Sequence, residues 1–216
     1  MSEVLNAQQQ YWEKTFYKNT DMFGAEPSEP AQVAAKLFKK EGKKKILELG
    51  GGQGRDSLFF AHNGFQVDVL DYSELGVNTI TEKAQKAGLT DSIAAHRHDV
   101  RKPLPFSDET FDACYSHMLF CMALTTSELE FLSREICRVL RPNGFHIYTV
   151  RNSNDPHYGT GIHIGEDTFE VGGFIVHFFN MQKVELLTKG YELISVDEFE
   201  EGKLPRKLFR VTLRKK

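Results

Sequence analysis

One short segment of the chain places a carboxylate directly before a row of glycines. Glu48 is followed by Gly50, Gly52 and Gly54 in the spacing E-x-G-x-G-x-G. Glycines permit sharp turns and let a ligand approach the backbone, although a packed turn between a strand and a helix also needs them. The dinucleotide spacing G-x-G-x-x-G fits poorly, because its last position falls on an arginine or a serine. A carboxylate before the loop instead suits a ligand with a cationic amine.

Two aspartates suit the adenosine part of such a ligand. Asp71 ends the second predicted strand, about 20 residues beyond the loop, where a carboxylate can accept both hydroxyls of a ribose. Asp99 ends the third predicted strand, where it can accept from an adenine amino group. The alternatives are a helix cap for Asp71 and a turn residue for Asp99. An adenosine together with an amine makes up S-adenosylmethionine (SAM), whose sulfonium carries a methyl group.

Strands and helices alternate along residues 45–150 and must hold these side chains in place. The alternation predicts an α/β fold with a doubly wound, mostly parallel sheet, which binds ligands at the carboxyl ends of its strands. We expect strands at residues 45–49, 65–71, within 92–100, at 111–118 and at 145–150, and helices at 55–64, 73–88 and 126–140.

The two ends of the chain depart from this alternation. Helices are expected at residues 5–17 and 30–38, and the first carries Tyr11 and Trp12. We expect this helix to close over the ligand as a lid; the alternative is an aromatic stripe packed on the sheet edge. Residues 151–173 have the composition of a loop.

The C-terminal residues predict a helix and a hairpin. The helix is expected at residues 180–190, and residues 191–200 and 207–216 alternate like two paired strands, which gives a seven-stranded sheet with an antiparallel edge. We expect one domain over residues 1–216, made of a helical lid region (1–42), a SAM-binding core (43–150) and a substrate-side loop, helix and hairpin (151–216).

Three segments together resemble the class I SAM-dependent methyltransferases. The segment ELGGGQGRDSLFFAHNGFQVDVLDYS is similar to motif I and the acidic strand end that follows it. The segments HDVRKPLPFSDETFDACYSHMLF and EICRVLRPNGFHIYTV resemble the adenine-binding turn with the fourth strand, and the next helix, turn and fifth strand. The resemblance implies a Rossmann-like methyltransferase fold, SAM as the cofactor and S-adenosylhomocysteine (SAH) as a product. The cofactor-binding residues that it implies are Glu48, Gly50, Gly52, Gly54, Asp71, Tyr72, Asp99, Val100, Ser116 and Tyr11.

Within the family, the stretch GQGRDSL is most similar to the tellurite-resistance branch of small-molecule methyltransferases. Members of that branch tend to carry a His-Arg pair in a closing G-x-L-H-R stretch. This chain reads GKLPR there, with Pro205 in place of the histidine and Arg206 retained. Arg206 is therefore a candidate substrate-binding residue, whereas a metalloid acceptor is not implied.

The ends of the fourth and fifth strands carry two candidate catalytic residues. His117 is a candidate general base; the alternative is a histidine that hydrogen-bonds the backbone beside the cofactor. Arg151 is a candidate for holding an anionic substrate, and its alternative is a salt bridge at the strand end. The mix of Arg, His and Tyr nearby favours a small, polar or anionic acceptor.

The segment beyond the fifth strand contributes candidate substrate-binding residues. These are His157, Tyr158 and His177, the last of which is alternatively a buried, hydrogen-bonded histidine. Asp155, His157 and His163 fit no strong metal-binding spacing, and we expect no metal.

Composition limits the partners. A net charge of −3 argues against nucleic acid, and no run approaches the roughly 18 apolar residues of a membrane span. Three cysteines without C-x-x-C spacing fit a reducing cytoplasm, and we expect a monomer or homodimer.

Three other functions are alternatives to the methylation of a small molecule. Methyltransferases of nucleic acids or proteins commonly carry N/D-P-P-Y/F after the fourth strand, where this chain has SHML. A non-catalytic SAM-binding regulator would not turn SAM over. A nicotinamide oxidoreductase is disfavoured by the spacing of the glycines.

Overall fold

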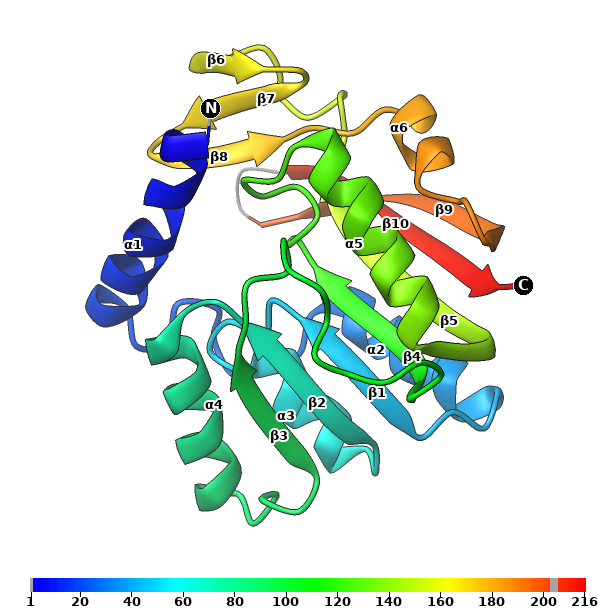
Figure 1. The fold of residues 1–216 in the computed structure, drawn as a ribbon. Coiled ribbons are helices and arrows are strands. Elements are labelled where there is room, and N and C mark those ends of the chain that lie inside the picture. Colours follow the sequence, from blue (N-terminus) through cyan, green and yellow to red (C-terminus); the bar gives the residue numbers. More distant parts are fainter. Residues whose placement is uncertain (1, 203–205) are drawn as a thin grey trace.

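A mixed seven-stranded sheet forms the centre of the molecule (Figure 1). The computed structural model describes residues 2–202 and 206–216. The strands are β1 (Lys45–Leu49), β2 (Gln66–Asp71), β3 (Ile93–Arg97), β4 (Phe111–His117), β5 (Leu140–Arg151), β9 (Tyr191–Glu201) and β10 (Arg206–Lys215). They lie in the order β3-β2-β1-β4-β5-β10-β9, with β10 antiparallel to both neighbours and the others parallel. The predicted α/β fold with an antiparallel C-terminal hairpin is confirmed.

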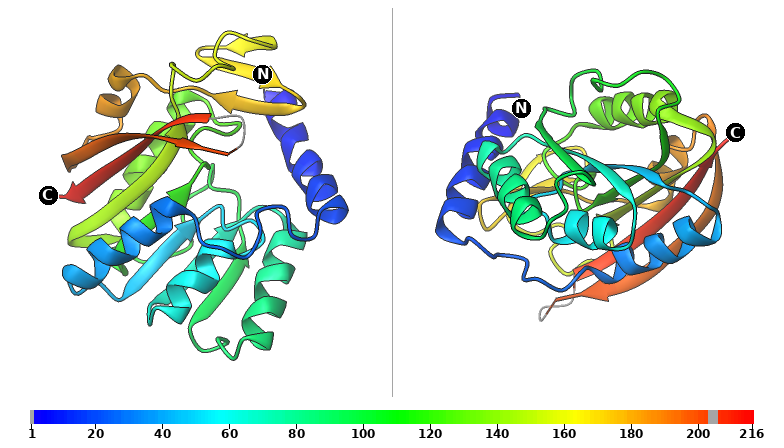
Figure 2. Two further views of the ribbon diagram at one scale, coloured as in Figure 1. Left: turned by 180° about the vertical axis from the view of Figure 1, so that it is seen from behind. Right: turned by 90° about the horizontal axis from the view of Figure 1, so that it is seen from below.

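Helices cover both faces of this sheet, because its central strands carry apolar residues on both faces. In β1, for example, Ile46 packs into the core on one face and Leu47 into the core on the other. Figure 2 shows the sheet between α5 on one side and α2 and α3 on the other. The helices are α1 (Ser2–Lys18), α2 (Glu29–Lys40), α3 (Arg55–His62), α4 (Glu74–Lys86), α5 (Thr126–Val139) and α6 (Met181–Leu186).

Side-chain caps fix the points at which two of these helices begin. Ser73 Oγ accepts from Gly76 N at 3.0 Å and so starts α4, as predicted. Thr125 and Glu128 form a capping box at the start of α5. Such a cap contributes about 1 kcal/mol. The cap at Ser73 leaves Asp71 at the very end of β2.

The expectation of a loop over residues 151–173 is wrong, because this region contains two strands of a second sheet. The strands β6 (Ile162–Gly165), β7 (Thr168–Val171) and β8 (Phe174–His177) form an antiparallel three-stranded sheet. Gly172 and Gly173 connect β7 to β8 with φ of 60° and 86°, the conformation that a two-residue hairpin turn requires. This Gly-Gly signal lies within the sequence that we expected to be a loop.

The small sheet and α1 stand beyond the carboxyl ends of the parallel strands. Figure 1 shows α1 beside β8 at one end and beside α4 at the other, and both contacts are present. In the described part of the chain, no helix has the length and apolar character needed to cross a bilayer. Lys203, Leu204 and Pro205 of the closing stretch lie outside the described residues.

Candidate active site

A cavity of about 600 Å³ opens at the carboxyl ends of β1, β2, β4 and β5, where the strand order reverses. The small sheet and α1 complete its walls with Val171, Phe174, Val176, Trp12 and Phe16. The predicted site residues that line it are Glu48, Gly50, Gly52, Asp71, Tyr72, Asp99, Val100, His117, Arg151, His157 and Arg206.

The glycine loop forms one wall. Gly50, Gly52 and Gly54 have φ of 75°, 56° and 85°, which side-chain-bearing residues rarely adopt. A Cβ at Gly50 would lie 3.1 Å from Leu119 Cβ, another residue that lines the cavity. Gly54 lies outside the cavity, at the N-cap of α3, where a Cβ would lie 2.9 Å from Ile80 Cγ1 of α4. The first two glycines therefore face the cavity, and the third permits close helix packing.

Asp71 ties this loop to the end of β2. Its Oδ2 accepts from Gly52 N at 2.8 Å, and its Oδ1 accepts from Ser73 N at 2.8 Å. Burial raises the pKa of Asp71 to about 6, although these backbone hydrogen bonds favour the ionised form. The helix cap itself is Ser73, so Asp71 is not a cap. Each carboxylate oxygen keeps a further lone pair for a ligand hydroxyl.

Glu48 lies deeper, under the loop. Its side chain accepts from Ser57 Oγ at 2.5 Å and the residue is 3% exposed. Burial, reinforced by the nearby charge of Asp56, raises the pKa of Glu48 to about 8. Glu48 is therefore protonated at neutral pH before a cationic ligand binds, which its position in the sequence did not reveal.

Without a bound ligand, the protein should lose stability as the pH rises from about 5 to about 8, because of Glu48. The folded side chain keeps its proton up to about pH 8, whereas the unfolded one releases it near 4.5. The free energy of unfolding therefore falls as pH rises through this window, by an amount on the order of a few kcal/mol. Glu48→Gln should flatten this dependence in urea unfolding at pH 5 and pH 8, while Glu41→Gln at an exposed position should not. Equal slopes in wild type and Glu48→Gln would contradict the assignment.

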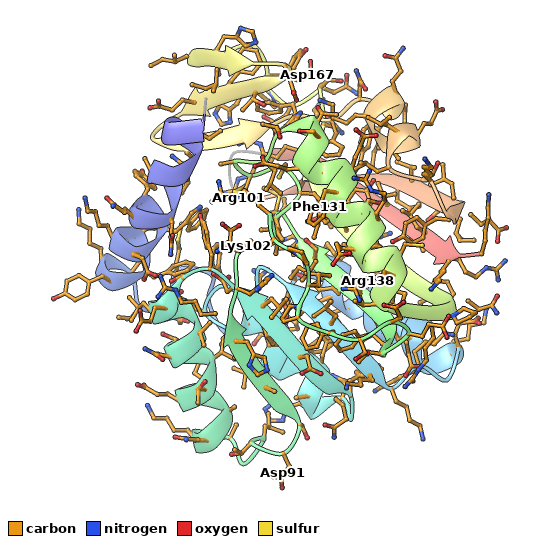
Figure 3. All side chains as sticks on the ribbon, viewed as in Figure 1. Asp91, Arg101, Lys102, Phe131, Arg138 and Asp167 are labelled. Carbon is orange, nitrogen blue, oxygen red and sulfur yellow. The ribbon has the colours of Figure 1, made fainter. Side chains whose placement is uncertain are left out.

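Asp99 and Tyr72 also line the cavity, beyond the ends of β3 and β2. Arg101 donates to both oxygens of Asp99, from Nε at 3.0 Å and from Nη2 at 2.7 Å. Burial opposes ionisation, but this guanidinium holds the pKa of Asp99 below its ordinary value. Figure 3 shows Arg101 between α1 and α5. Arg101 also lines the cavity and was not singled out from the sequence.

His117, at the end of β4, has a partner at each ring nitrogen. Its Nδ1 lies 2.8 Å from Thr149 Oγ1, and its Nε2 lies 3.3 Å from Glu201 Oε1. The next residue, Met118, has φ of 66°, a strained conformation of the kind that clusters at functional sites. Glu201 was missed, because no local pattern shows which acidic residue of the closing hairpin reaches the cavity.

Arg151 is held in a buried ion pair. Its Nε and Nη2 donate to Asp155 Oδ2 and Oδ1 at 3.0 and 2.5 Å, and Nη2 also lies 2.5 Å from His157 Nδ1. Burial alone would raise the pKa of Asp155, but Arg151 keeps it below its ordinary value. The salt bridge that the sequence offered as the alternative role of Arg151 is therefore present, and Arg151 also lines the cavity.

Four other predicted residues lie outside the cavity. Tyr11 donates to Gly172 O, Tyr158 donates to Asp167 Oδ1, and Ser116 is fully buried in β4. His177 is also fully buried; its Nδ1 lies 2.7 Å from Leu124 O, and Lys183 Nζ approaches its Nε2. Within the described ranges, no three His, Cys, Asp or Glu side chains are grouped to hold a metal ion.

The helix α1 joins the two sides of the cavity. Glu13 accepts from Glu74 N and Leu75 N at the start of α4, and Gln9 Nε2 donates to Tyr72 O. At the other end, Gln8 Nε2 donates to Gly173 O in the β7–β8 turn. The helix therefore spans from the cofactor side of the crevice to the small sheet.

Residues 46–144 match the family model described as "Methyltransferase domain". This stretch, just under half of the chain, is similar to a methyltransferase domain. The matched part contains β1 to β4, the glycine loop, Asp71 and Asp99. The residues that line the cavity fit the SAM expected from the sequence, because the cavity runs from backbone without side chains at Gly50 and Gly52 to carboxylates at two strand ends.

Curated relatives are similar over part of the chain. The 24-methylenesterol C-methyltransferase 2 of Oryza sativa subsp. japonica is 29% identical over 63% of this chain and 38% of its own length. The sarcosine/dimethylglycine N-methyltransferase of Aphanothece halophytica is 29% identical over 49% of this chain and 37% of its own. The chain thus spans well under two thirds of the length of these relatives.

A solved structure covers nearly the whole chain. It is the Burkholderia thailandensis 1,6-didemethyltoxoflavin-N1-methyltransferase with bound 1,6-didemethyltoxoflavin and SAH, with a TM-score of 0.76. The match covers 99% of this chain and 89% of that one at 16% identity, which shows the shared fold alone. The narrower resemblance to the tellurite-resistance branch stays a prediction.

Proposed function

We propose that the protein transfers a methyl group from SAM to a small-molecule acceptor. The supporting observation is one continuous cavity with the glycine loop and Asp71 at one end and His117, Arg151 and Glu201 at the other. The names of the relatives and the solved neighbour give a sterol, sarcosine and toxoflavin-type acceptor, all of them small molecules.

The cofactor supplies an already activated methyl group, so the main task of the protein is to align the acceptor with it. Such alignment can contribute roughly 7–11 kcal/mol toward lowering the barrier. In this proposal the glycine loop, Asp71 and Asp99 hold the cofactor, while His117 and Arg151 shape the acceptor end.

We also propose that α1 is the lid of this site. Trp12 and Phe16 line the cavity, and Trp12 packs 5.0 Å from Phe174 of the small sheet, measured between ring centroids. Closure by the aromatic side chains of this otherwise polar helix would exclude water from the reacting groups. Trp12 is the one tryptophan in the sequence, so its fluorescence reports on this helix.

A titration followed by Trp12 fluorescence tests both proposals. SAM and SAH should change the emission, and NAD should not, because the loop lacks the dinucleotide spacing. Incubation with SAM and a panel of small amines, thiols, alcohols and oxyanions should then release SAH, with the product identified by its mass. Binding of NAD in preference to SAM would contradict the proposed function. Binding of SAM without turnover of any acceptor, including nucleic acid and protein, would identify a SAM-binding regulator.

A further inference from the structure

We propose that Glu201 contacts the methyl acceptor and that the reacting atom of the acceptor is an amine nitrogen. This inference rests on the proposed methyl transfer and names the acceptor class at the same site. Glu201 ends β9, lines the cavity and keeps 27% of its side chain exposed. A carboxylate in that position selects an acceptor that brings hydrogen-bond donors and gains positive charge.

The other acidic side chains that line the cavity already have close partners in the protein. Glu48 accepts from a serine hydroxyl, Asp56 from Ser28, Asp71 from two backbone N–H groups and Asp99 from a guanidinium. Glu201 Oε2, by contrast, lies 3.9 Å from the nearest guanidinium nitrogen, which is beyond hydrogen-bond distance. Among these acids, Glu201 therefore keeps the most free acceptor capacity.

His117 positions this carboxylate. Its Nε2 lies 3.3 Å from Glu201 Oε1, so this nitrogen carries the proton and donates it to the hydrogen bond. Its Nδ1 is occupied by Thr149 Oγ1 at 2.8 Å. His117 thus keeps no lone pair for the acceptor in this arrangement, and the general-base role expected for it passes to Glu201.

The arginines at this end of the cavity each have a carboxylate nearby. Arg151 is paired with the buried Asp155, Arg55 lies 3.1 Å from Asp56, and Arg206 Nη1 lies 3.9 Å from Glu201 Oε2. An oxyanion or thiolate acceptor would therefore have to compete with Glu201 for Arg206, whereas an amine would bind the carboxylate directly. Of the polar or anionic acceptors that the mix of Arg, His and Tyr favours, this arrangement selects a polar one, an amine.

The transfer balances with Glu201 as the proton acceptor. The nitrogen lone pair forms the bond to the methyl carbon while the carbon–sulfur bond breaks and its electron pair stays on the sulfur of SAH. The nitrogen becomes positively charged beside Glu201 and then gives its N–H proton to that carboxylate. A thiolate, whose negative charge disappears in the reaction, would gain nothing from this side chain.

Benzylammonium and benzoate test the inference, because they share a shape and differ in charge. Each is titrated at neutral pH into the protein saturated with SAH. Wild type should prefer benzylammonium, and Glu201→Gln should weaken its binding by about 10-fold or more, as expected for a lost charge-assisted hydrogen bond. Glu200→Gln is the matched control, since this neighbouring glutamate is exposed and points away from the cavity.

A double-mutant cycle tests whether His117 acts through Glu201. His117→Asn should weaken benzylammonium binding in wild type and have no further effect in Glu201→Gln. Independent, additive effects would overturn the positioning role.

The acceptor class is overturned if wild type with SAH prefers benzoate, binds neither compound, or loses as much affinity in Glu200→Gln as in Glu201→Gln. Failure of wild type to bind SAH at all would instead contradict the proposed function, so the two failures are distinguishable.

Discussion

Replacing Asp71 with asparagine is expected to weaken SAM binding by roughly 10- to 100-fold, the range for a lost hydrogen bond to a charged group. In the structure both carboxylate oxygens accept backbone N–H groups, from Gly52 and Ser73. An asparagine can accept at one end and must present its NH₂ to an N–H donor at the other. The glycine loop would therefore lose its tie to β2, and a ribose would lose a charged acceptor.

Isothermal titration with SAM and SAH measures this loss, with circular dichroism to show that the fold persists. Asp68→Asn on the same strand is the control, because Asp68 takes part in the looser ion pair with Lys45 at 3.7 Å. Wild type should show a similar loss of affinity as the pH falls below about 6, where Asp71 takes up a proton. An Asp71→Asn variant that binds SAM as wild type does would remove Asp71 from the cofactor site.

Replacing Arg151 with methionine is expected to lower the free energy of unfolding by about 3–5 kcal/mol, the cost of breaking a buried ion pair. The Asp155 side chain is fully buried, and its remaining partners would be the backbone N–H groups of His157 and Lys207. The effect comes from the negative charge of Asp155, which would be left buried without an opposite charge. Turnover should fall as well, because Asp155 holds the backbone of Lys207 in β10, next to Arg206 at the acceptor end of the cavity.

Urea unfolding of both single variants, the double variant and a control separates these causes. Arg151→Met/Asp155→Asn should be less destabilised than the sum of the single variants, because it leaves no unpaired charge. Arg141→Met is the control at an exposed pair with Asp112, where a loss below about 1 kcal/mol is expected. A loss of that small size at Arg151 would show that the pair does not stabilise the fold.

The sequence alone was sufficient where local chemistry decides the structure. The apolar residues of β1 and β2 fill both faces of a parallel sheet, so the strands and the carboxylate that ends β2 could be predicted. Glycines that need positive φ between a strand and a helix predicted the loop, and Ser73 predicted the start of α4. The family resemblance followed from these same residues.

The sequence also contains a signal for the small three-stranded sheet, but the composition of residues 151–173 hid it. The residues before β8 are rich in glycine and charge, which favoured a loop, although Gly172–Gly173 is a hairpin signal. Four-residue strands leave too short a pattern for their alternation to outweigh that composition. The small sheet that completes the cavity was therefore not expected.

Tertiary structure alone decided which charged groups meet. Glu201 reaches His117 because β9 pairs with β10 and β10 with β5 in a register that includes a shift between Thr212 and Leu213. A change of register by one residue would turn Glu201 to the other face of the sheet. Burial, which raises the pKa of Glu48 to about 8, is likewise a property of the packed layers. The sequence thus predicted the fold and the glycine loop with the carboxylate that ends β2. Strand register and packing decided which side chains meet at the other end of the cavity, because both depend on residues far apart in the chain.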